Sequence, residues 1–234
     1  LLFDTETTGL DPMTDTVIEA AGALWSIEHK CIVSAFSLLK KADQNPGYAI
    51  NKIPIEGLVS YGADHPSFIS TIKDWVLLAD AVVAHNAAFD RAFLPELHGV
   101  QRQWICSCDD IEWPGTGGSK SLISLCLERG IGVASAHRAL ADVLLLARLF
   151  ERTAETHDIG QLLALAVMPR VKYVVTNRGF DVKRNAAAKR AGFRWDPDKK
   201  EWWARLREDQ ANAIDFKIHS VGCGGDDYEQ RWRG

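Results

Sequence analysis

At the start of the chain, apolar stretches that predict strands are separated by polar stretches that predict turns. Residues 1–4 are apolar and predict the end of a buried strand, whereas residues 5–16 are rich in Gly, Pro and Asp and predict a turn. β-Branched and apolar residues fill 17–27 and 31–39, with a polar tripeptide between them, which predicts a hairpin. Because the chain begins inside a strand and without Met, we expect native residues before Leu1.

The middle of the chain alternates between helical spacing and short apolar runs. Apolar residues recur at helical spacing in 66–79, and a short apolar strand at 81–84 ends at His85 and Asn86. The pattern then predicts, in order, a helix near 88–98, a strand at 104–107, a flexible loop at 114–118, and helices at 121–129 and 139–152. A three-strand meander followed by alternating helices and strands predicts an α/β fold with a mixed sheet.

The composition changes after Pro169, so we expect a second, smaller domain. The predicted organisation is a first domain at 1–152, a connector helix at 153–170, a small α+β domain at 171–220 and a frayed tail at 221–234. Within the small domain the pattern predicts a strand at 173–176, a helix at 182–191, a hairpin at 193–206 and a helix at 208–219.

Length and composition exclude several classes of protein. The chain has 234 residues, and its 47% of hydrophobic and 25% of charged residues are ordinary for a globular protein. No apolar run reaches the roughly 18–20 residues that span a bilayer, so we predict no membrane segment. The five Cys residues include no C-x-x-C pair, so we expect no zinc ribbon but reduced thiols and a cytoplasmic location.

Three stretches carry acidic residues where buried elements end. Asp4 and Glu6 are two residues apart, so on a strand they point to the same face, and two adjacent negative charges are costly without a cation. Asp90 follows the strand that ends at His85 and Asn86, and Asn86 is also a helix-cap candidate. His137 and Asp142 diverge by about 140° on a continuous helix, so both face one site only if His137 precedes it.

These residue types suit a site for two divalent cations. Carboxylate oxygens favour Mg²⁺ or Mn²⁺, and two such ions about 3.5–4 Å apart can activate water and stabilise the leaving oxygen of a phosphodiester. A nearby imidazole can accept the proton of that water, because it titrates close to neutrality. The sequence therefore predicts Asp4, Glu6, Asp90 and Asp142 as ligands of two Mg²⁺ or Mn²⁺ ions, with His137 beside them.

The order D-x-E-T-T-G, H-N-A-x-F-D and H-x-A-x-x-D over residues 1–152 resembles the DnaQ-like, DEDDh family of 3′–5′ exonucleases. Arg138 stands where a Tyr would mark the other branch of that superfamily. The resemblance implies an RNase H-like fold and the release of nucleoside monophosphates from a 3′ end. It also implies that His137 is the general base, that Thr8, Gly9 and Leu10 meet the terminal nucleotide, and that Asn86 and Phe89 line that pocket.

The net charge of −4 divides unevenly along the chain. Residues 1–168 hold 12 Lys and Arg against 21 Asp and Glu, whereas residues 169–234 hold 15 against 10. Basic and aromatic residues together can bind phosphates and stack on unpaired bases. The candidate nucleic-acid contacts are Arg178, Arg194, Trp195, Lys199, Lys200, Trp202 and Trp203. The alternative is a small domain whose Trp residues form its core and whose cations are only solvated.

Residues 189–203 add a second resemblance. They are similar to a small module with the pattern A-x-G-x-R-W-D…W that is appended to some nucleic-acid enzymes. Because Trp202 and Trp203 are adjacent on a predicted strand, they should face opposite sides of it.

Three hypotheses on function follow. The first is a metal-dependent 3′–5′ exonuclease of the DNA repair or proofreading type, which acts on single-stranded or frayed DNA 3′ ends and has a polymerase as a candidate partner. The second is an exoribonuclease on RNA ends or short oligoribonucleotides, since nothing in the motifs reads the 2′-hydroxyl. The third, from another class, is a polymerase-associated accessory protein that binds nucleic acid. The oligomeric state stays open.

Overall fold

The computed structural model describes residues 1–117, 119–134, 137–176 and 182–221. Contacts between Cα atoms divide the chain into two compact units, Leu1–Val167 and Met168–Gly234. We call them the catalytic unit and the C-terminal unit and describe each by itself. Across the described residues, we find no helix with the length and apolar character that crossing a membrane requires.

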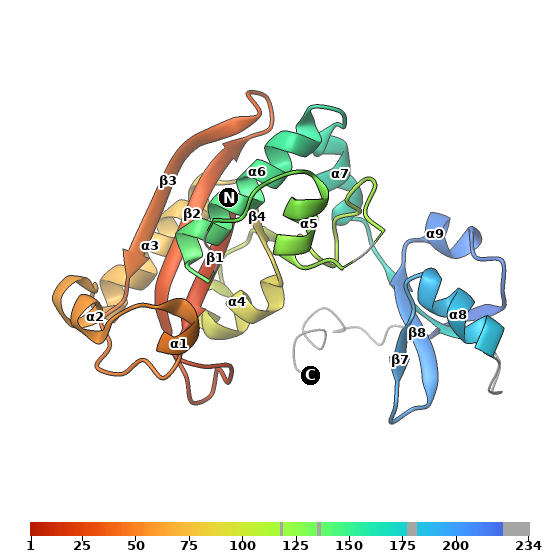
Figure 1. The fold of residues 1–234 in the computed structure, drawn as a ribbon, viewed down its shortest axis with the longest axis horizontal. Coiled ribbons are helices and arrows are strands. Elements are labelled where there is room, and N and C mark those ends of the chain that lie inside the picture. The colour runs from red at the N-terminus through yellow and green to blue at the C-terminus, as the bar shows by residue number, and fades with distance from the viewer. Residues whose placement is uncertain (118, 135–136, 177–181, 222–234) are drawn as a thin grey trace. The chain divides into compact units, whose positions relative to one another are not determined.

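A five-stranded mixed sheet forms the centre of the catalytic unit, in the order β3-β2-β1-β4-β5 (Figure 1). The strands are β1 Leu2–Thr7, β2 Val17–Ser26, β3 Cys31–Leu39, β4 Ala81–Ala84 and β5 Gln103–Cys106. The first three pair as an antiparallel meander, and β4 and β5 join it parallel to β1.

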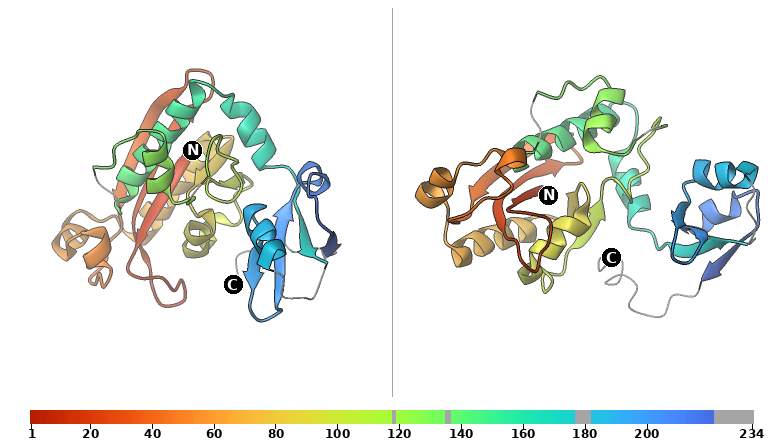
Figure 2. Two further views of the ribbon diagram at one scale, coloured as in Figure 1. Left: turned by 45° about the vertical axis from the view of Figure 1, so that its right-hand side comes forward. Right: turned by 60° about the horizontal axis from the view of Figure 1, so that its bottom comes forward.

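Helices cover both faces of this sheet (Figures 1 and 2). Those of the catalytic unit are α1 Tyr48–Asn51, α2 Ile55–Tyr61, α3 His65–Leu78, α4 Ala87–Phe93, the 3₁₀ turn η1 Pro95–Leu97, α5 Leu122–Glu128, α6 Ala139–Ala154 and α7 Ile159–Ala166. The hydrophobic core on one face draws on α5, α6 and α7, and the core on the other draws on α3 and α4.

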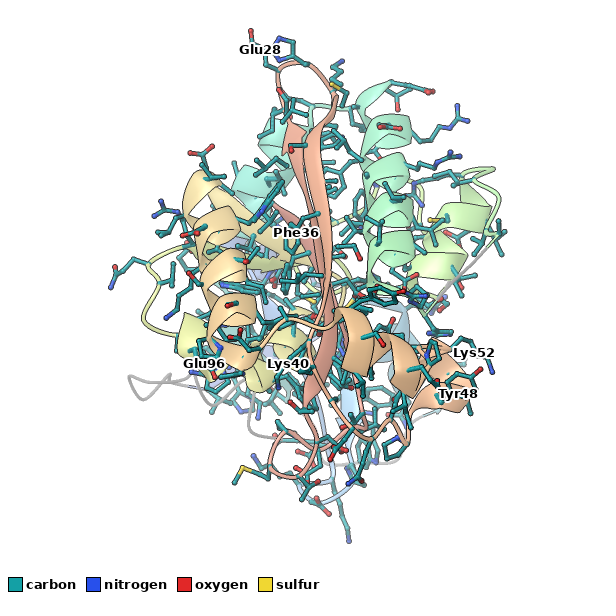
Figure 3. The ribbon with its side chains drawn as sticks, turned by 90° about the vertical axis from the view of Figure 1, so that its left-hand side faces the viewer. Glu28, Phe36, Lys40, Tyr48, Lys52 and Glu96 are labelled. Carbon is teal, nitrogen blue, oxygen red and sulfur yellow. The ribbon has the colours of Figure 1, made fainter. Side chains whose placement is uncertain are left out.

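The alternation of side chains along β1 decides which residues meet which helices. Leu2 joins the core with α6, whereas Phe3, the next residue, joins the core with α3 and α4. Because the period of a strand is two, Asp4 then points to the α6 face and Thr5 to the α4 face. On the α3 side, Phe36 of β3, which is labelled in Figure 3, packs on Trp75 with ring centroids 4.7 Å apart.

The structure confirms the predicted α/β class, with a mixed sheet flanked by helices and a small second sheet. The first strand is longer than predicted, because Glu6 and Thr7 still pair with β2. The helix expected near 88–98 ends at Phe93, since Pro95 cannot continue it and starts η1 instead. No prediction covered α1 and α2, and Gly118 of the predicted loop lies outside the described residues.

The C-terminal unit contains a four-stranded antiparallel sheet in the order β7-β8-β6-β9. Its elements are β6 Val171–Val175, α8 Val182–Arg190, β7 Arg194–Asp196, β8 Glu201–Leu206, α9 Glu208–Asn212 and β9 Ile218–Val221. Ala188 of α8, Phe193, Ala204 and Leu206 form the buried centre of a small core.

The helix predicted at 208–219 is wrong in its second half. Helix α9 ends at Asn212, and Ile218–Val221 form strand β9, which pairs with β6. A strand is favoured here because β9 pairs with the edge of β6 and Ile218 packs against the small core. Of the predicted tail at 221–234, Val221 belongs instead to β9, and residues 222–234 lie outside the described residues.

Candidate active site

Two carboxylates stand on the central strand of the catalytic unit. Asp4 and Glu6 lie on β1, opposite Ala21 and Glu19 of β2, and both are half-buried. They share the face of the sheet that α6 covers, as the i, i+2 spacing predicts. The apolar residues before them pack into the core, so the strand brings both acidic groups to the edge of a buried region.

Asp142 reaches the same place from the first turn of α6. One oxygen each from Asp4, Glu6 and Asp142 lies within 4.8 Å of the others, a separation at which a single cation can contact all three. We call these three residues the acid cluster. His137 lies before the helix, as its spacing from Asp142 requires, and its backbone N–H donates to Oδ2 of Asp142 at 3.2 Å. Its φ of 62° is left-handed, and its side chain is exposed.

Asp90 approaches from the opposite face of the sheet. It lies on α4, is 1% exposed, and accepts a 2.8 Å hydrogen bond at Oδ1 from the hydroxyl of Thr5. Its Oδ2 is buried and has no hydrogen-bond partner among the described residues. The structure therefore does not place Asp90 in the acid cluster, but the Asp90 charge is near enough to help raise the pKa of Asp4.

A fifth carboxylate, which the sequence analysis did not predict, holds the segment that carries His137. Glu19 of β2 is 1% exposed and accepts two hydrogen bonds from the Arg138 guanidinium, at 3.0 and 2.9 Å. It also accepts from the N–H of Ala139 at 3.2 Å and from the Ser37 hydroxyl at 3.2 Å. Glu19 thus fixes the start of α6, directly after His137. A single Glu within an apolar β-strand was the available signal.

The pKa values record how crowded these negative charges are. Burial, followed by the charges of Asp90, Asp142, Glu6 and Glu19, holds the pKa of Asp4 well above its usual range. Burial and the charges of Asp142 and Glu19 raise the pKa of Glu6 to about 8. Burial also raises the pKa of Asp142. The pKa of Asp90 is raised to about 7, because burial raises it more than the hydrogen bond from Thr5 lowers it.

This donor set fits divalent cations. All the groups are carboxylates, which are hard oxygen ligands, and Asp90 keeps an oxygen that no described protein group satisfies. Repulsion and desolvation disfavour the charged forms, and a bound cation offsets both costs. Without a cation, these residues cost stability and contribute little to packing.

The residues predicted to meet the terminal nucleotide surround the turn after β1. Thr8 is buried, and its hydroxyl donates to Asp15 Oδ1 at 3.1 Å and accepts from the N–H of Thr16. A Cβ at Gly9 would overlap the Asp15 carboxylate, so any larger residue there would displace that side chain. Leu10 is 82% exposed. Contact with a nucleotide stays a prediction for all three.

The other two predicted pocket residues lie at the start of α4. Asn86 is in the N-cap position with a φ of 68°, but its side chain makes no capping hydrogen bond. Capping therefore does not account for its side chain. Phe89 is half-buried, with its ring 4.8 Å from that of Phe93.

In the C-terminal unit, some of the predicted nucleic-acid contacts pack within the unit and others are exposed. Trp202 packs on the small core and donates its indole N–H to Asn185 at 3.0 Å, as the core alternative predicts. Trp203 points to the other side of β8, where the Lys172 ammonium is 5.4 Å from its ring centroid. Trp195 is 48% exposed, and Arg194, Lys199 and Lys200 are exposed too. Arg178 lies outside the described residues.

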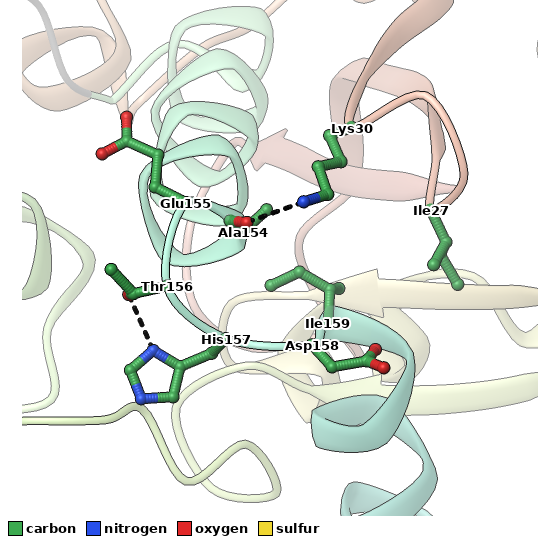
Figure 4. Close-up of a pocket in the computed structure, with 8 residues that line it drawn as sticks. All are labelled: Ile27, Lys30, Ala154, Glu155, Thr156, His157, Asp158 and Ile159. Atoms are coloured by element: carbon green, nitrogen blue, oxygen red, sulfur yellow. Dashed lines mark hydrogen bonds between the residues drawn. The ribbon is translucent and has the colours of Figure 1, made fainter.

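A cavity of about 450 Å³ lies elsewhere in the catalytic unit (Figure 4). Lys30 donates to the Ala154 carbonyl across it at 3.0 Å, and the Thr156 hydroxyl and His157 Nδ1 are 2.8 Å apart. Ala154, the one residue of α6 that lines this cavity, is 12 residues beyond Asp142. At the rise of a helix, that places the cavity about 18 Å from Asp142. No predicted site residue lines it.

Comparisons with known proteins bear on both units. The chain is 32% identical over 189 residues to a DNA polymerase III subunit epsilon of Treponema pallidum, covering 74% of this chain and 85% of that relative. The chain belongs to the DnaQ-like, DEDDh family of 3′–5′ exonucleases. The RNase H-like fold of the catalytic unit agrees with this membership.

Other matches agree with the family. A DNA polymerase III PolC-type of Thermotoga maritima is 28% identical over 191 residues, covering 74% of this chain, but the chain spans only 13% of that relative. A structure of exonuclease X in complex with 5′ overhanging duplex DNA is 26% identical, with a TM-score of 0.54, over 70% of this chain and 98% of that one. Residues 181–221 match a protein-family profile described as a domain of unknown function (DUF8626).

Proposed function

We propose that this DnaQ-like exonuclease is metal-dependent and hydrolyses phosphodiester bonds at single-stranded or frayed DNA 3′ ends, releasing nucleoside monophosphates. The observation that carries the proposal is the acid cluster, in which Asp4, Glu6 and Asp142 converge from two elements against the cost of burial and repulsion. A protein has no structural reason to retain such a cluster, whereas a divalent cation gives it one.

We assign two Mg²⁺ or Mn²⁺ ions to Asp4, Glu6, Asp90 and Asp142. When bound, such ions lower the pKa of a water and stabilise the negative charge that develops on the leaving oxygen. The Thr5 hydroxyl holds one oxygen of Asp90 at 2.8 Å and leaves the other without a protein partner, so this side chain is already oriented for a ligand.

His137 is the proposed general base. In the hydrolysis, the oxygen of a water forms a bond to phosphorus, the bond from phosphorus to the 3′ oxygen breaks, and His137 accepts the proton that the water loses. The departing 3′ oxygen takes up a proton from solvent water, so the shortened strand keeps a 3′-hydroxyl, and the product is a nucleoside 5′-monophosphate. Supporting this role, the backbone N–H of His137 is held by Asp142, and the residue after it is held by Glu19.

The turn after β1 is the proposed subsite for the terminal nucleotide. Gly9 allows the backbone to pass close to Asp15, and Leu10 offers an exposed apolar surface in the turn that follows Glu6 and Thr7, on which a base or sugar can pack. Asn86 and Phe89, at the start of α4 next to Asp90, complete the proposed pocket.

The test is a panel of single-stranded DNA, duplex DNA with a mismatched 3′ end, and RNA, each labelled at the 3′ or 5′ end. With Mg²⁺, we expect early release of labelled mononucleotide from 3′-labelled DNA and a ladder of shortened products from 5′-labelled DNA. Asp4→Asn should abolish both. Equal activity of Asp4→Asn would refute the assignment of the metal site, and preference for RNA would favour the exoribonuclease.

We further propose a proofreading role beside a polymerase. The specific support is the relative named DNA polymerase III subunit epsilon, of which this chain covers 85%. The role predicts faster hydrolysis of a mismatched than of a matched 3′ terminus. Tight nucleic-acid or polymerase binding that persists without metal, and without any hydrolysis, would instead favour the accessory protein.

A further inference from the structure

We propose that α8 and Trp195 of the C-terminal unit form a surface that binds single-stranded DNA independently of the acid cluster. We call it the α8 surface and define it by Trp195 and the exposed side chains of Lys183, Lys189 and Arg190. The proposal rests on the proposed function in one respect, which is that DNA rather than RNA is taken as the ligand. The family profile for this region assigns it no function.

Trp195 is exposed and at the same time held in place. Within β7 it stands directly opposite Trp202 of β8, and the two ring centroids are 5.7 Å apart. Trp202 is itself fixed, because its indole N–H donates to Asn185 of α8 and its ring packs on the core. Trp195 keeps 48% of its surface exposed, so a flat aromatic ring is presented to solvent with little freedom to lose on binding.

Helix α8 contacts Trp202, the ring on which Trp195 packs, and its charged residues are all basic. It contains four basic residues and no acidic one. The hydrogen bond from Trp202 to Asn185 joins α8 to β8, and the N–H of Phe193, the residue directly before β7, donates to the Ala188 carbonyl at 2.9 Å. The chain therefore places cations and an exposed aromatic ring on the same face of this sheet.

Single-stranded DNA is the occupant that these features fit. Its unpaired bases stack on aromatic rings, and its phosphates bind Lys and Arg without sequence preference. Residues 169–234 hold 15 basic and 10 acidic residues, so the unit attracts a polyanion. An apolar protein partner would use Trp195 but not the basic face of α8.

The test measures binding of a fluorescein-labelled dT₂₀ oligonucleotide by anisotropy, with the full chain in EDTA so that no hydrolysis occurs. Stacking on one aromatic ring is worth roughly 1–3 kcal/mol, so Trp195→Ala should weaken binding about ten-fold, and Trp195→Phe less. Lys189→Gln should weaken binding about two- to three-fold and lower the salt dependence by about 0.7 in the log–log slope.

Lys217→Gln is the matched control. Lys217 is exposed in the same unit but precedes β9, at the opposite edge of the sheet from β7, and its loss should change affinity less than two-fold. Three results would each overturn the proposal: no binding by the unaltered chain, Trp195→Ala within two-fold of it, or equal effects of Lys189→Gln and Lys217→Gln. Failure of the proposed nuclease would appear elsewhere, as absence of hydrolysis with Mg²⁺.

Discussion

In the catalytic unit, Asp4, Glu6 and Asp142 are brought together at the edge of a buried region, and their pKa values rise because neither burial nor proximity favours the charged forms. In the C-terminal unit, the side chains of Lys183, Lys189 and Arg190 of α8 are exposed, and Trp202 packs against the core. The first arrangement is costly and the second is not. Crowded buried charge is therefore strong evidence of function, whereas exposed charge needs a second feature, such as Trp195.

After the loss of activity expected for Asp4→Asn, the next largest effect on the rate should come from His137. Removal of a general base costs roughly 10²–10⁴-fold in rate, so His137→Ala should lower kcat by that factor in a 3′-labelled DNA assay with Mg²⁺. Because its side chain is exposed, we expect unchanged folding. His157→Ala, which changes another exposed His three residues beyond the end of α6, is the control and should leave kcat unchanged. Comparable losses in both variants would exclude His137 as the base.

The second prediction concerns stability in the C-terminal unit. Trp202→Ala removes a ring from the core and leaves Asn185 without its donor, so it should destabilise this unit by about 2–4 kcal/mol. Trp195→Ala removes an exposed ring and should cost less than about 1 kcal/mol. Hydrogen exchange of the β6 and β8 amides would measure both, and equal losses would refute the separation of their roles.

The third prediction tests the support beneath the site. Glu19→Gln removes the charge that binds Arg138 and Ala139, so the start of α6 and His137 should lose their fixed position. We expect kcat to fall roughly ten-fold with a smaller change in KM. Glu28→Gln, an exposed Glu in the β2–β3 turn, is the control. A kcat equal in the two variants would show that the Glu19 contacts do not position the site.

The fourth prediction concerns the dependence of stability on pH in the metal-free protein. Glu6 titrates near 4.5 when unfolded and about 8 when folded, so between these values the folded chain binds more protons. The free energy of unfolding should therefore fall as pH rises from about 4.5 to 8, and more steeply because Asp4 and Asp142 shift in the same direction. Thermal melts in EDTA would measure this, and a rise across that window would contradict it.

Much of the fold could be predicted because its elements have regular patterns. The strand at 81–84 and the helix beginning at Ala139 agree with the sequence prediction at those bounds, since each is a clear apolar run or helical stripe. Helices α1 and α2 were missed because Pro54, Gly57 and Gly62 interrupt their segment. Strand β9 was missed because its stability comes from pairing with β6, which no local pattern records.

The same contrast holds for the candidate site. The motif spacing brought Asp4, Glu6 and Asp142 together correctly, because strand and helix periods fix where side chains point. The Glu19–Arg138 pair joins residues 119 positions apart, so only the folded sheet reveals it. The hydrogen bond between Thr5 and Asp90, on the α4 face of the sheet, likewise depends on how α4 packs and has no local pattern in the sequence.

The central claim is that the acid cluster exists to bind divalent cations. The most direct measurement is a calorimetric titration of Mn²⁺ into the metal-free chain at pH 8, with Asp4→Asn and the exposed-residue control Asp43→Asn beside it. The account predicts about two ions per chain for the unaltered protein and for Asp43→Asn, and weak or no binding for Asp4→Asn. Equal binding by Asp4→Asn, or none by the unaltered chain, would contradict it.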